Sequence, residues 1–266
     1  MTMIHQTAII EPGAKLHESV KIGPFCHIGP HVEIGPCSNL HAHVVISGRT
    51  LIGASTQIFP FACVGSASQD QKAALQEGTV TLGDECLIRE NVTINSGIGL
   101  GTRIGRGCVF LAGAHVAHDC RLGDKVLLAN NVLLGGHVDL DDHVVIGGGA
   151  AIHQYVRIGA YAFIGGLAGV EGDVAPFALA GGNRAHLYGL NLTGLSRHGF
   201  NPERIAKLKI VYRELFNHQS NQVFRERLVE ARKLFGDQSD VKMLLDFFDQ
   251  NNKRPLCAPR RQRSIA

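Results

Sequence analysis

Histidine is the residue type in this sequence that is best suited to chemistry near neutral pH. Five of the 14 histidines lie within residues 115–153, namely His115, His118, His137, His143 and His153. A neutral imidazole can act as a general base that takes a proton from an attacking nucleophile. Histidines that lie close together can instead bind zinc. Which use is open depends on how the fold places these side chains.

The elements that would position the histidines follow from a six-residue repeat. A large apolar residue occupies every sixth position over residues 4–64, 82–94 and 98–170, which gives 27 hexads. A second column of small or β-branched residues lies four positions after the first. A period of six matches neither a helix nor a half-buried strand, but it is typical of short strands and tight turns that stack into a hexapeptide β-helix. The repeat is interrupted at residues 65–81 and 95–97, where a site specific to this protein is expected.

Three hexads close one coil of 18 residues, so the repeat predicts about nine coils and places residues 18 apart above one another. His118 would lie beneath Gly136, with Gln154 one coil further on, and Asp119 would lie beneath His137. A glycine above a histidine leaves room for a substrate, and its backbone N–H can approach an oxygen atom. Stacking alone leaves catalysis, zinc binding and a structural role at the surface all open.

The composition agrees with a narrow prism, and the cysteine pattern agrees with a cytoplasmic protein. Glycine supplies 32 of 266 residues and tryptophan is absent, which suits frequent turns around a thin core. The seven cysteines form no CxxC pair, and four of them fall in the small inward column, so we expect buried, reduced thiols. We expect no transmembrane segment and a cytoplasmic protein, because no apolar run reaches 18 residues and the N-terminus lacks the pattern of a signal peptide.

The C-terminal third has a different pattern. We expect the β-helix over residues 1–183 and a small α-helical domain over residues 184–266. Helical periodicity covers residues 202–216, 222–235 and 239–250. The net charge is −5 over residues 1–183 and +8 over residues 184–266. This basic region indicates either an acidic or phosphate-bearing partner or simply a solvated helical surface. The basic tail over residues 253–266 is expected to be loosely ordered, with contact to a membrane surface as an alternative role.

Several motifs resemble one enzyme family. They are GAHVAHDC at residues 113–120, LANN at 128–131, GGHV at 135–138, IHQ at 152–154 and QDQK at 69–72. In this combination and spacing they resemble UDP-N-acetylglucosamine O-acyltransferases, which catalyse the first step of lipid A biosynthesis. The likeness extends through the helical region and covers nearly the whole chain. It implies a mainly β fold, a left-handed parallel β-helix of hexapeptide repeats followed by a small helical domain.

The resemblance also implies a reaction and a set of catalytic residues. An acyl chain, commonly 3-hydroxylated, would pass from acyl carrier protein to the 3-hydroxyl of UDP-N-acetylglucosamine, with no cofactor, no metal and no covalent enzyme intermediate. His118 matches the general base, Asp119 would help to orient the site, and the backbone N–H of Gly136 matches the donor to the oxyanion.

Other positions match residues that bind substrate. They are Asp70, Lys72, His115, His137, His153, Gln154, Gly166, Asn191 and Arg197. Gly166 matches a glycine that leaves the acyl groove open to a long chain, and Asn191 and Arg197 match residues near the nucleotide. Members of the family are homotrimers, and no nucleic acid partner is expected. Arg204, Lys207, Lys209 and Arg213 recur along one predicted helix and are candidates for docking the acidic carrier.

Three departures from the family pattern keep other functions open. Asn95-Ser96-Gly97 replaces a longer glycine-rich loop, Thr193 replaces a glutamate, and Arg184 stands where a histidine is common. These changes motivate a second hypothesis, a related acyltransferase that N-acylates an amino-sugar nucleotide. A non-catalytic β-helix that binds nucleotide sugar or carrier protein is a third, and a metal site like that of a carbonic anhydrase is a fourth.

Overall fold

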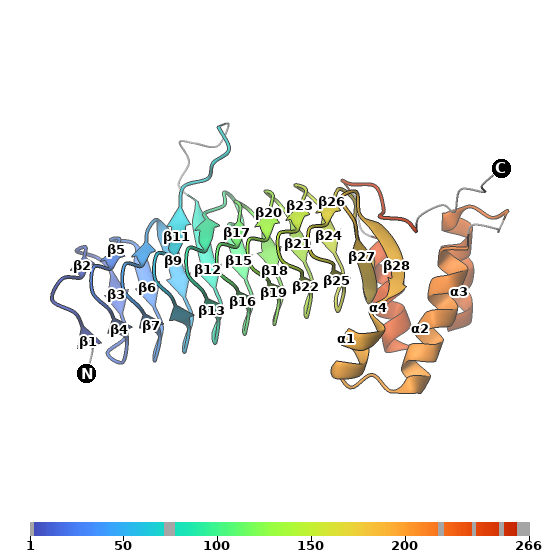
Figure 1. Ribbon diagram of the computed structural model, residues 1–266, viewed down its shortest axis with the longest axis horizontal. Helices are drawn as coiled ribbons and strands as arrows, with labels where there is room; N and C mark the ends of the chain where they lie inside the picture. Colours follow the sequence, from blue (N-terminus) through green and yellow to red (C-terminus); the bar gives the residue numbers. More distant parts are fainter. Residues whose placement is uncertain (1–2, 72–77, 218–220, 236–237, 250–252, 260–266) are drawn as a thin grey trace.

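The computed structural model describes residues 3–71, 78–217, 221–235, 238–249 and 253–259, and Lys72 lies outside these ranges. Figure 1 shows a long prism of short strands with a group of helices at its C-terminal end. Each turn of the prism contributes one strand to each of three parallel sheets, which we call sheets A, B and C.

The strands of each sheet lie side by side along the prism. Sheet A contains, in spatial order, β1 (Met3–Ile4), β4 (Lys21–Ile22), β7 (Asn39–Leu40), β10 (Gln57–Ile58), β13 (Leu87–Ile88), β16 (Val109–Phe110), β19 (Leu127–Leu128), β22 (Val145–Ile146), β25 (Phe163–Ile164), β27 (Ala178–Gly181) and β28 (His186–Leu190). Sheet B contains β2 (Ile9–Ile10), β5 (His27–Ile28), β8 (Val45–Ile46), β11 (Cys63–Ser66), β14 (Thr93–Asn95), β17 (His115–Val116), β20 (Leu133–Leu134), β23 (Ala151–Ile152) and β26 (Gly169–Val170). Sheet C contains β3 (Lys15–Leu16), β6 (Val32–Ile34), β9 (Arg49–Ile52), β12 (Thr79–Leu82), β15 (Thr102–Ile104), β18 (Arg121–Leu122), β21 (Asp139–Leu140) and β24 (Arg157–Ile158).

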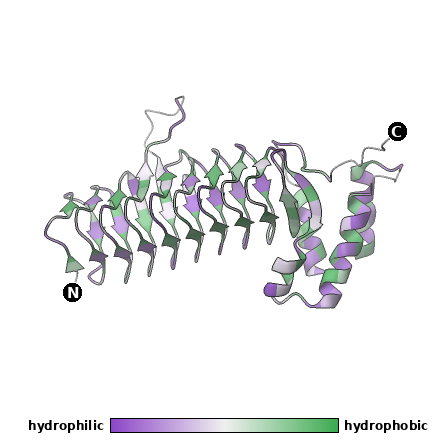
Figure 2. Ribbon diagram, in the orientation of Figure 1, coloured by the Kyte–Doolittle hydropathy of each residue, from purple (hydrophilic) through white to green (hydrophobic). Residues whose placement is uncertain are grey.

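The pairing confirms the predicted stacking of coils. His115 pairs with Leu133 and Leu133 with Ala151, a register shift of 18 residues per coil. Ten strands of sheet A run parallel, so the solenoid has about ten turns, close to the predicted nine. Polar and apolar residues alternate along the strands, as the colours of Figure 2 show, because only one side of each strand faces the interior.

The inward columns fill the core of the prism. Aliphatic residues such as Ile28, Ile46 and Val116 are fully buried, and each contributes about 1.5–3 kcal/mol by leaving water. The four cysteines of the small column are also buried, as predicted: Cys26, Cys86, Cys108 and Cys120.

One position of the predicted repeat is wrong. Ile98 was expected to begin a new hexad, but it lies outside the strands and is only half-buried. The inward column passes from Ile94 directly to Ile104, and both of these side chains are buried. The intervening residues form an insertion at a corner of the prism. An apolar residue in an insertion can therefore imitate the repeat without entering the core.

The corners of the prism are built by residues in the left-handed backbone region. Among the described residues, sixteen that are not glycine have φ between 54° and 66°, including Asp119, His137 and Tyr155. This conformation costs about 1–2 kcal/mol per residue. The backbone offsets the cost, because the N–H of a corner residue donates to the coil before it, as His137 does to His118 O at 3.0 Å. Corner side chains consequently project outward, one above another.

The helical region follows a hairpin of β27 and β28, which pair antiparallel. Its helices are α1 (Leu192–Arg197), α2 (Pro202–Leu215), α3 (Phe224–Phe235), α4 (Ser239–Asp246) and the 3₁₀ helix η1 (Phe247–Asp249). The short helix α1 was not predicted, and the other three lie where the periodicity placed them. The proposed domain boundary at residue 183 falls in the turn of the hairpin. In the described part of the chain, no helix is long and apolar enough to cross a membrane.

The expectation of a loosely ordered tail is wrong for its described part, residues 253–259, which we call the C-terminal tail. Asp173 N donates to Pro255 O, and Cys257 N donates to Asp173 O, both at 2.8 Å. Cys257 is buried. The tail runs back from η1 onto the end of the prism, so its basic residues are held by backbone pairing that the sequence pattern does not reveal.

Candidate active site

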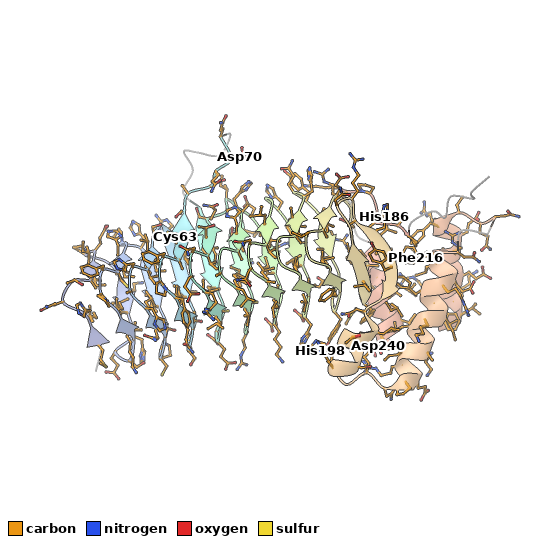
Figure 3. All side chains as sticks on the ribbon, in the orientation of Figure 1. Cys63, Asp70, His186, His198, Phe216 and Asp240 are labelled. Carbon is orange, nitrogen blue, oxygen red and sulfur yellow. The ribbon has the colours of Figure 1, made fainter. Side chains whose placement is uncertain are left out.

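One corner of the prism, where sheet B passes into sheet C, carries the unusual features of the chain. Two insertions lie at this corner: one has residues 67–71 and 78 as its described part, between β11 and β12, and the other is residues 96–101, between β14 and β15. His118 follows β17 at this same corner. Figure 3 shows Asp70, on the first insertion, well beyond the coils. Two excursions and a histidine cluster at one corner indicate a binding site there.

His118 and Asp119 form a hydrogen-bonded pair at the centre of this corner. His118 Nδ1 lies 2.8 Å from Asp119 Oδ2, and the two side chains are only 14% and 13% exposed. An ionised carboxylate can only accept, so Nδ1 carries the proton and Nε2 keeps a free lone pair. Nε2 faces Gly136, where an added Cβ would lie 2.5 Å from it. The predicted arrangement of glycine above histidine is confirmed, and the absence of a side chain on Gly136 leaves space next to Nε2.

A column of rings continues from this pair along the corner. The His137 ring meets the His118 ring edge-on with centroids 5.1 Å apart, and Tyr155 stacks on His137 at 4.6 Å. Lys253 Nζ lies 4.3 Å from the centroid of the Tyr155 ring. The C-terminal tail therefore reaches the same corner as the insertions.

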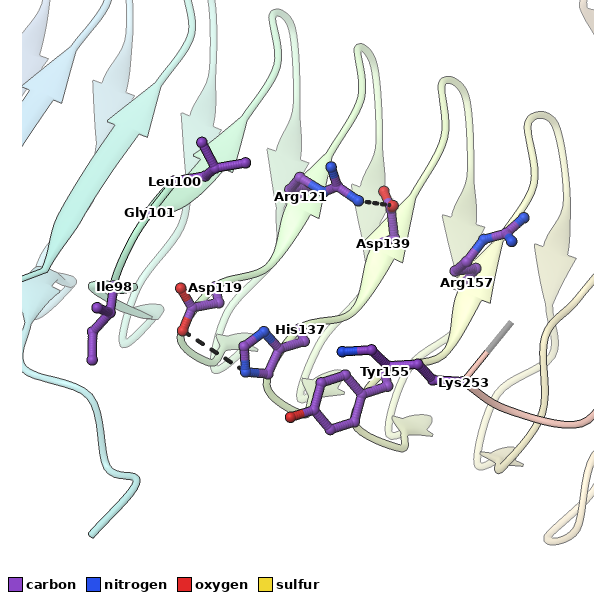
Figure 4. A pocket seen from close by; sticks show the side chains of 10 residues that line it. All are labelled: Ile98, Leu100, Gly101, Asp119, Arg121, His137, Asp139, Tyr155, Arg157 and Lys253. Carbon is purple, nitrogen blue, oxygen red and sulfur yellow. Dashed lines mark hydrogen bonds and ion pairs between the residues drawn. The ribbon is translucent and has the colours of Figure 1, made fainter. Parts of the chain in front are cut away.

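A cavity of about 400 Å³ lies beside the column (Figure 4). Its lining residues are Ile98, Leu100, Gly101, Asp119, Arg121, His137, Asp139, Tyr155, Arg157 and Lys253. Burial lowers the pKa of His137, and Lys253 adds to this effect, while the carboxylates of Asp119 and Asp70 oppose it. A lowered pKa favours the neutral form of the His137 imidazole, which can both donate and accept a hydrogen bond. The electrostatic effect of Asp70 also shows that the first insertion brings this residue near the site.

Asn95 and Thr102 connect the insertions to Asp119. Asn95 is buried, and its Nδ2 donates to Ala67 O in the first insertion at 2.9 Å. Thr102 Oγ1 donates to Asn95 O at 2.8 Å and accepts from Asp119 N at 2.9 Å. Asn95 and Thr102 thus help to hold Asp119 in place.

The other predicted histidines are placed differently. His115 lies on sheet B, with Nδ1 at 2.7 Å from Thr93 Oγ1, and burial lowers its pKa. His153 is exposed at the corner, where its Nδ1 lies 2.5 Å from Arg254 Nη2. His153 Nδ1 also lies 3.2 Å from Gln154 O. Arg254 Nε also donates to Gln154 O at 2.8 Å.

The remaining predicted residues lie at other corners of the same chain. Gly166 follows β25 where sheet A passes into sheet B. Asn191 caps α1 by accepting from Gly194 N at 3.1 Å, and its Nδ2 donates to Tyr161 O at 3.0 Å, at the corner between sheets C and A. Arg197 is exposed in the last turn of α1. A single chain therefore does not bring Gly166, Asn191 and Arg197 together with His118.

The same corner holds a set of atoms that can bind a metal. One donor atom from each of His118, Asp119 and His137 lies within 4.8 Å of the other two. Imidazole nitrogens and a carboxylate oxygen are ligands that zinc accepts. Binding there would take the Asp119 oxygen or the lone pair of His118 away from other chemistry.

Sequence reasoning did not name Tyr155, Thr102 or Lys253, and it named Asn95 only as part of an interruption of the repeat, without a contact. Tyr155 is 18 residues after His137, so the stacking rule would have placed it. Asn95 and Thr102 lie around an insertion, where the rule fails, and Lys253 lies outside the repeat altogether.

Comparison with known proteins identifies the family. Residues 13–48 and 101–136 match the model of the bacterial transferase hexapeptide (six repeats), and residues 173–257 match domain 2 of UDP-N-acetylglucosamine O-acyltransferase. An acyl-[acyl-carrier-protein]–UDP-N-acetylglucosamine O-acyltransferase from Anaeromyxobacter sp. is 45% identical over 247 residues, which are 92% of this chain and 95% of that protein. The chain belongs to this O-acyltransferase family.

Further relatives agree with this O-acyltransferase assignment. One from Rhizobium johnstonii is 42% identical over 261 residues, 97% of this chain and 95% of the relative. A solved UDP-N-acetylglucosamine acyltransferase from Campylobacter jejuni is 35% identical with a TM-score of 0.90, covering 97% of this chain and 100% of that one. The predicted resemblance and the predicted fold class are confirmed, and the protein is a transferase of the hexapeptide-repeat type.

Proposed function

We propose that this protein transfers an acyl chain from acyl carrier protein to the 3-hydroxyl of UDP-N-acetylglucosamine, the first step of lipid A biosynthesis. The observation that carries the proposal is the His118–Asp119 pair beneath Gly136, with the free nitrogen of His118 facing the glycine. The names of the relatives supply the substrates. In this proposal the enzyme works in the cytoplasm, where both substrates are made.

The geometry supports direct attack with a histidine base. His118 Nε2 takes the proton of the sugar 3-hydroxyl while the hydroxyl oxygen attacks the thioester carbon. The charge that develops on the carbonyl oxygen is stabilised by the N–H of Gly136. The carbonyl oxygen of the same peptide group, Gly135 O, accepts from Cys120 Sγ at 3.2 Å, which helps to fix the direction of this N–H. The C–S bond then breaks, and the protonated His118 returns its proton to the leaving thiolate. Asp119 stabilises the imidazolium and orients the ring.

The test of this function compares acceptors. The protein is incubated with hydroxyacyl carrier protein and either UDP-N-acetylglucosamine or the corresponding amino-sugar nucleotide, and the products are weighed by mass spectrometry. We expect an O-acylated product from the first acceptor. Product from the amine alone would establish the N-acyltransferase instead, and no product from either would favour a binding module. A panel of acyl chain lengths tests the long chain implied by Gly166.

A homotrimer with sites between subunits is part of the proposal. It is supported by the placement of Gly166, Asn191 and Arg197 at corners away from His118, since neighbouring prisms would bring different corners together. The remaining substrate contacts in this proposal come from Asp70, Lys72, His137, His153 and Gln154.

Co-expression of His118→Ala and Arg197→Ala chains tests the shared site. Each variant alone is expected to have little activity. Random mixing in trimers leaves both residues intact at about one site in four, so activity should recover to about a quarter of the wild-type value if the site is shared. Activity is measured on trimers purified after co-expression. Recovery no greater than the mean of the two single variants would place both residues within one chain.

Two of the four residues predicted to dock the carrier protein are already paired within the chain. Arg204 donates to Asp240 through Nε and Nη2 at 2.7 and 2.8 Å, and Lys207 pairs with Glu203 at 2.8 Å, so both charges are engaged within the chain. Lys209 and Arg213 are exposed on α2. These two remain the candidates for contact with an acidic carrier protein.

The metal hypothesis has a separate test. We expect extensive treatment with a chelator to leave kcat unchanged, because base catalysis by His118 requires no metal. Added zinc is expected to inhibit, because the donors of His118, Asp119 and His137 can bind it and the lone pair of the base would then be occupied. Loss of activity on chelation that is restored by one equivalent of zinc would show a metal enzyme instead.

A further inference from the structure

We propose that Lys253, which the C-terminal tail brings to the corner, binds a phosphate group of a substrate. The inference rests on the proposed function for the identity of the substrates. Neither the sequence motifs nor the repeat points to this residue.

The tail holds Lys253 in place through the residues that follow it. Arg254 Nε donates to Gln154 O at 2.8 Å, and Pro255 and Cys257 pair with the backbone of Asp173. The tail also approaches closely at Gly172, where an added Cβ would lie 2.6 Å from Pro255 O. These contacts on successive residues fix the direction in which Lys253 leaves the backbone.

The side chain of Lys253 points into the cavity beside His137 and Tyr155 (Figure 4). Its ammonium lies over the Tyr155 ring, and in the described part of the chain no carboxylate forms an ion pair with it. A cation held against an aromatic face keeps its hydrogen-bond donors free for a ligand.

The charges around the cavity favour an anion at this point. Two carboxylates line the cavity, and both have partners, since Asp139 pairs with Arg121 at 2.7 Å and Asp119 with His118. Arg157 also lines the cavity, and its Nη2 donates to Phe247 O at 2.8 Å. The cavity is thus lined by three cationic residues and by two carboxylates that are engaged with other groups, and Lys253 reaches it from the C-terminal tail.

Phosphate is the anion that both substrates of the proposed reaction carry. The nucleotide sugar has a diphosphate, and the carrier protein has the phosphodiester of its pantetheine arm. A lysine ammonium suits either as a point charge. The chemistry is the same in both cases, and the experiment separates the two sources.

Lys253→Gln is compared with Lys253→Arg and with Lys233→Gln, a matched loss of an exposed lysine on α3. The binding of UDP and of uridine is measured by calorimetric titration, and KM is measured for each substrate. If the nucleotide is the source, Lys253→Gln weakens UDP binding about tenfold, leaves uridine binding unchanged and raises KM for the nucleotide sugar. If the carrier is the source, UDP binding is unchanged and KM for the acyl carrier rises about tenfold. Lys253→Arg should restore most of the loss.

The proposal is overturned if Lys253→Gln changes neither UDP binding nor either KM by more than the Lys233→Gln control does. Thermal unfolding verifies that the variants are folded, which is expected because both lysines are exposed. Titration with UDP needs no turnover. If the wild-type protein binds UDP through Lys253 but forms no product, the proposed reaction is refuted, whereas the proposed phosphate site at Lys253 stands.

Discussion

Replacement of His118 by alanine is expected to lower kcat by about 10³-fold, within the range that a general base contributes. The physical reason is that a neutral sugar hydroxyl attacks a thioester slowly unless a base removes its proton during the attack. His118 Nε2 is the nitrogen available for this, because Nδ1 is engaged with Asp119. The measurement is the steady-state rate of acyl transfer, with the substrates at saturation.

The fold should survive this change. The His118 side chain projects from a corner, and the inward columns that stabilise the prism are untouched. His31→Ala is the matched control, since His31 is an exposed histidine near the N-terminal end of the prism, and it should retain full activity. Undiminished kcat in His118→Ala would remove the residue from the mechanism.

Replacement of Gly136 by alanine is expected to lower kcat/KM by about 100-fold, through obstruction of the base and displacement of the oxyanion donor. A Cβ at Gly136 would lie 2.5 Å from His118 Nε2 and 2.7 Å from Cε1, so one of the two groups must move. Gly136 is outside the left-handed φ region, so alanine brings no backbone strain. The assay is again acyl transfer, accompanied by thermal unfolding.

Gly29→Ala provides the matched control for this second change. At Gly29 an added Cβ would meet nothing closer than 3.5 Å, which is ordinary contact. Its activity and stability should therefore resemble those of the wild type. If Gly136→Ala were as active as Gly29→Ala, the space above His118 would not be where the substrate reacts.

The sequence could predict the fold and the surroundings of the His118–Asp119 pair because the coils of a solenoid repeat at a fixed interval. Each coil repeats after 18 residues, so the neighbours of His118 are found by counting, and Gly136 and His137 were placed correctly in this way. Counting failed where residues are inserted, as at Ile98, because an insertion adds length without adding a strand.

The rest of the corner depends on contacts between segments that have no fixed offset. Asn95 reaches Ala67 across two insertions, and Lys253 reaches Tyr155 from beyond the helices. No periodic pattern relates these pairs. Residues such as Arg197 are a different case, because they were matched by family resemblance and lie at another corner of the same chain.

The C-terminal region also terminates the solenoid. A stack of parallel coils ends in unpaired N–H and C=O groups, which invite another chain to add a strand. In this chain each sheet is closed differently: β28 pairs antiparallel with β27, Ala185 N donates to Gly169 O on β26, and Val174 and the tail continue sheet C. The segment that carries Lys253 toward the cavity thus also covers the end of the prism. Removal of this segment is therefore expected both to weaken phosphate binding and to expose strand edges that can pair with a second prism.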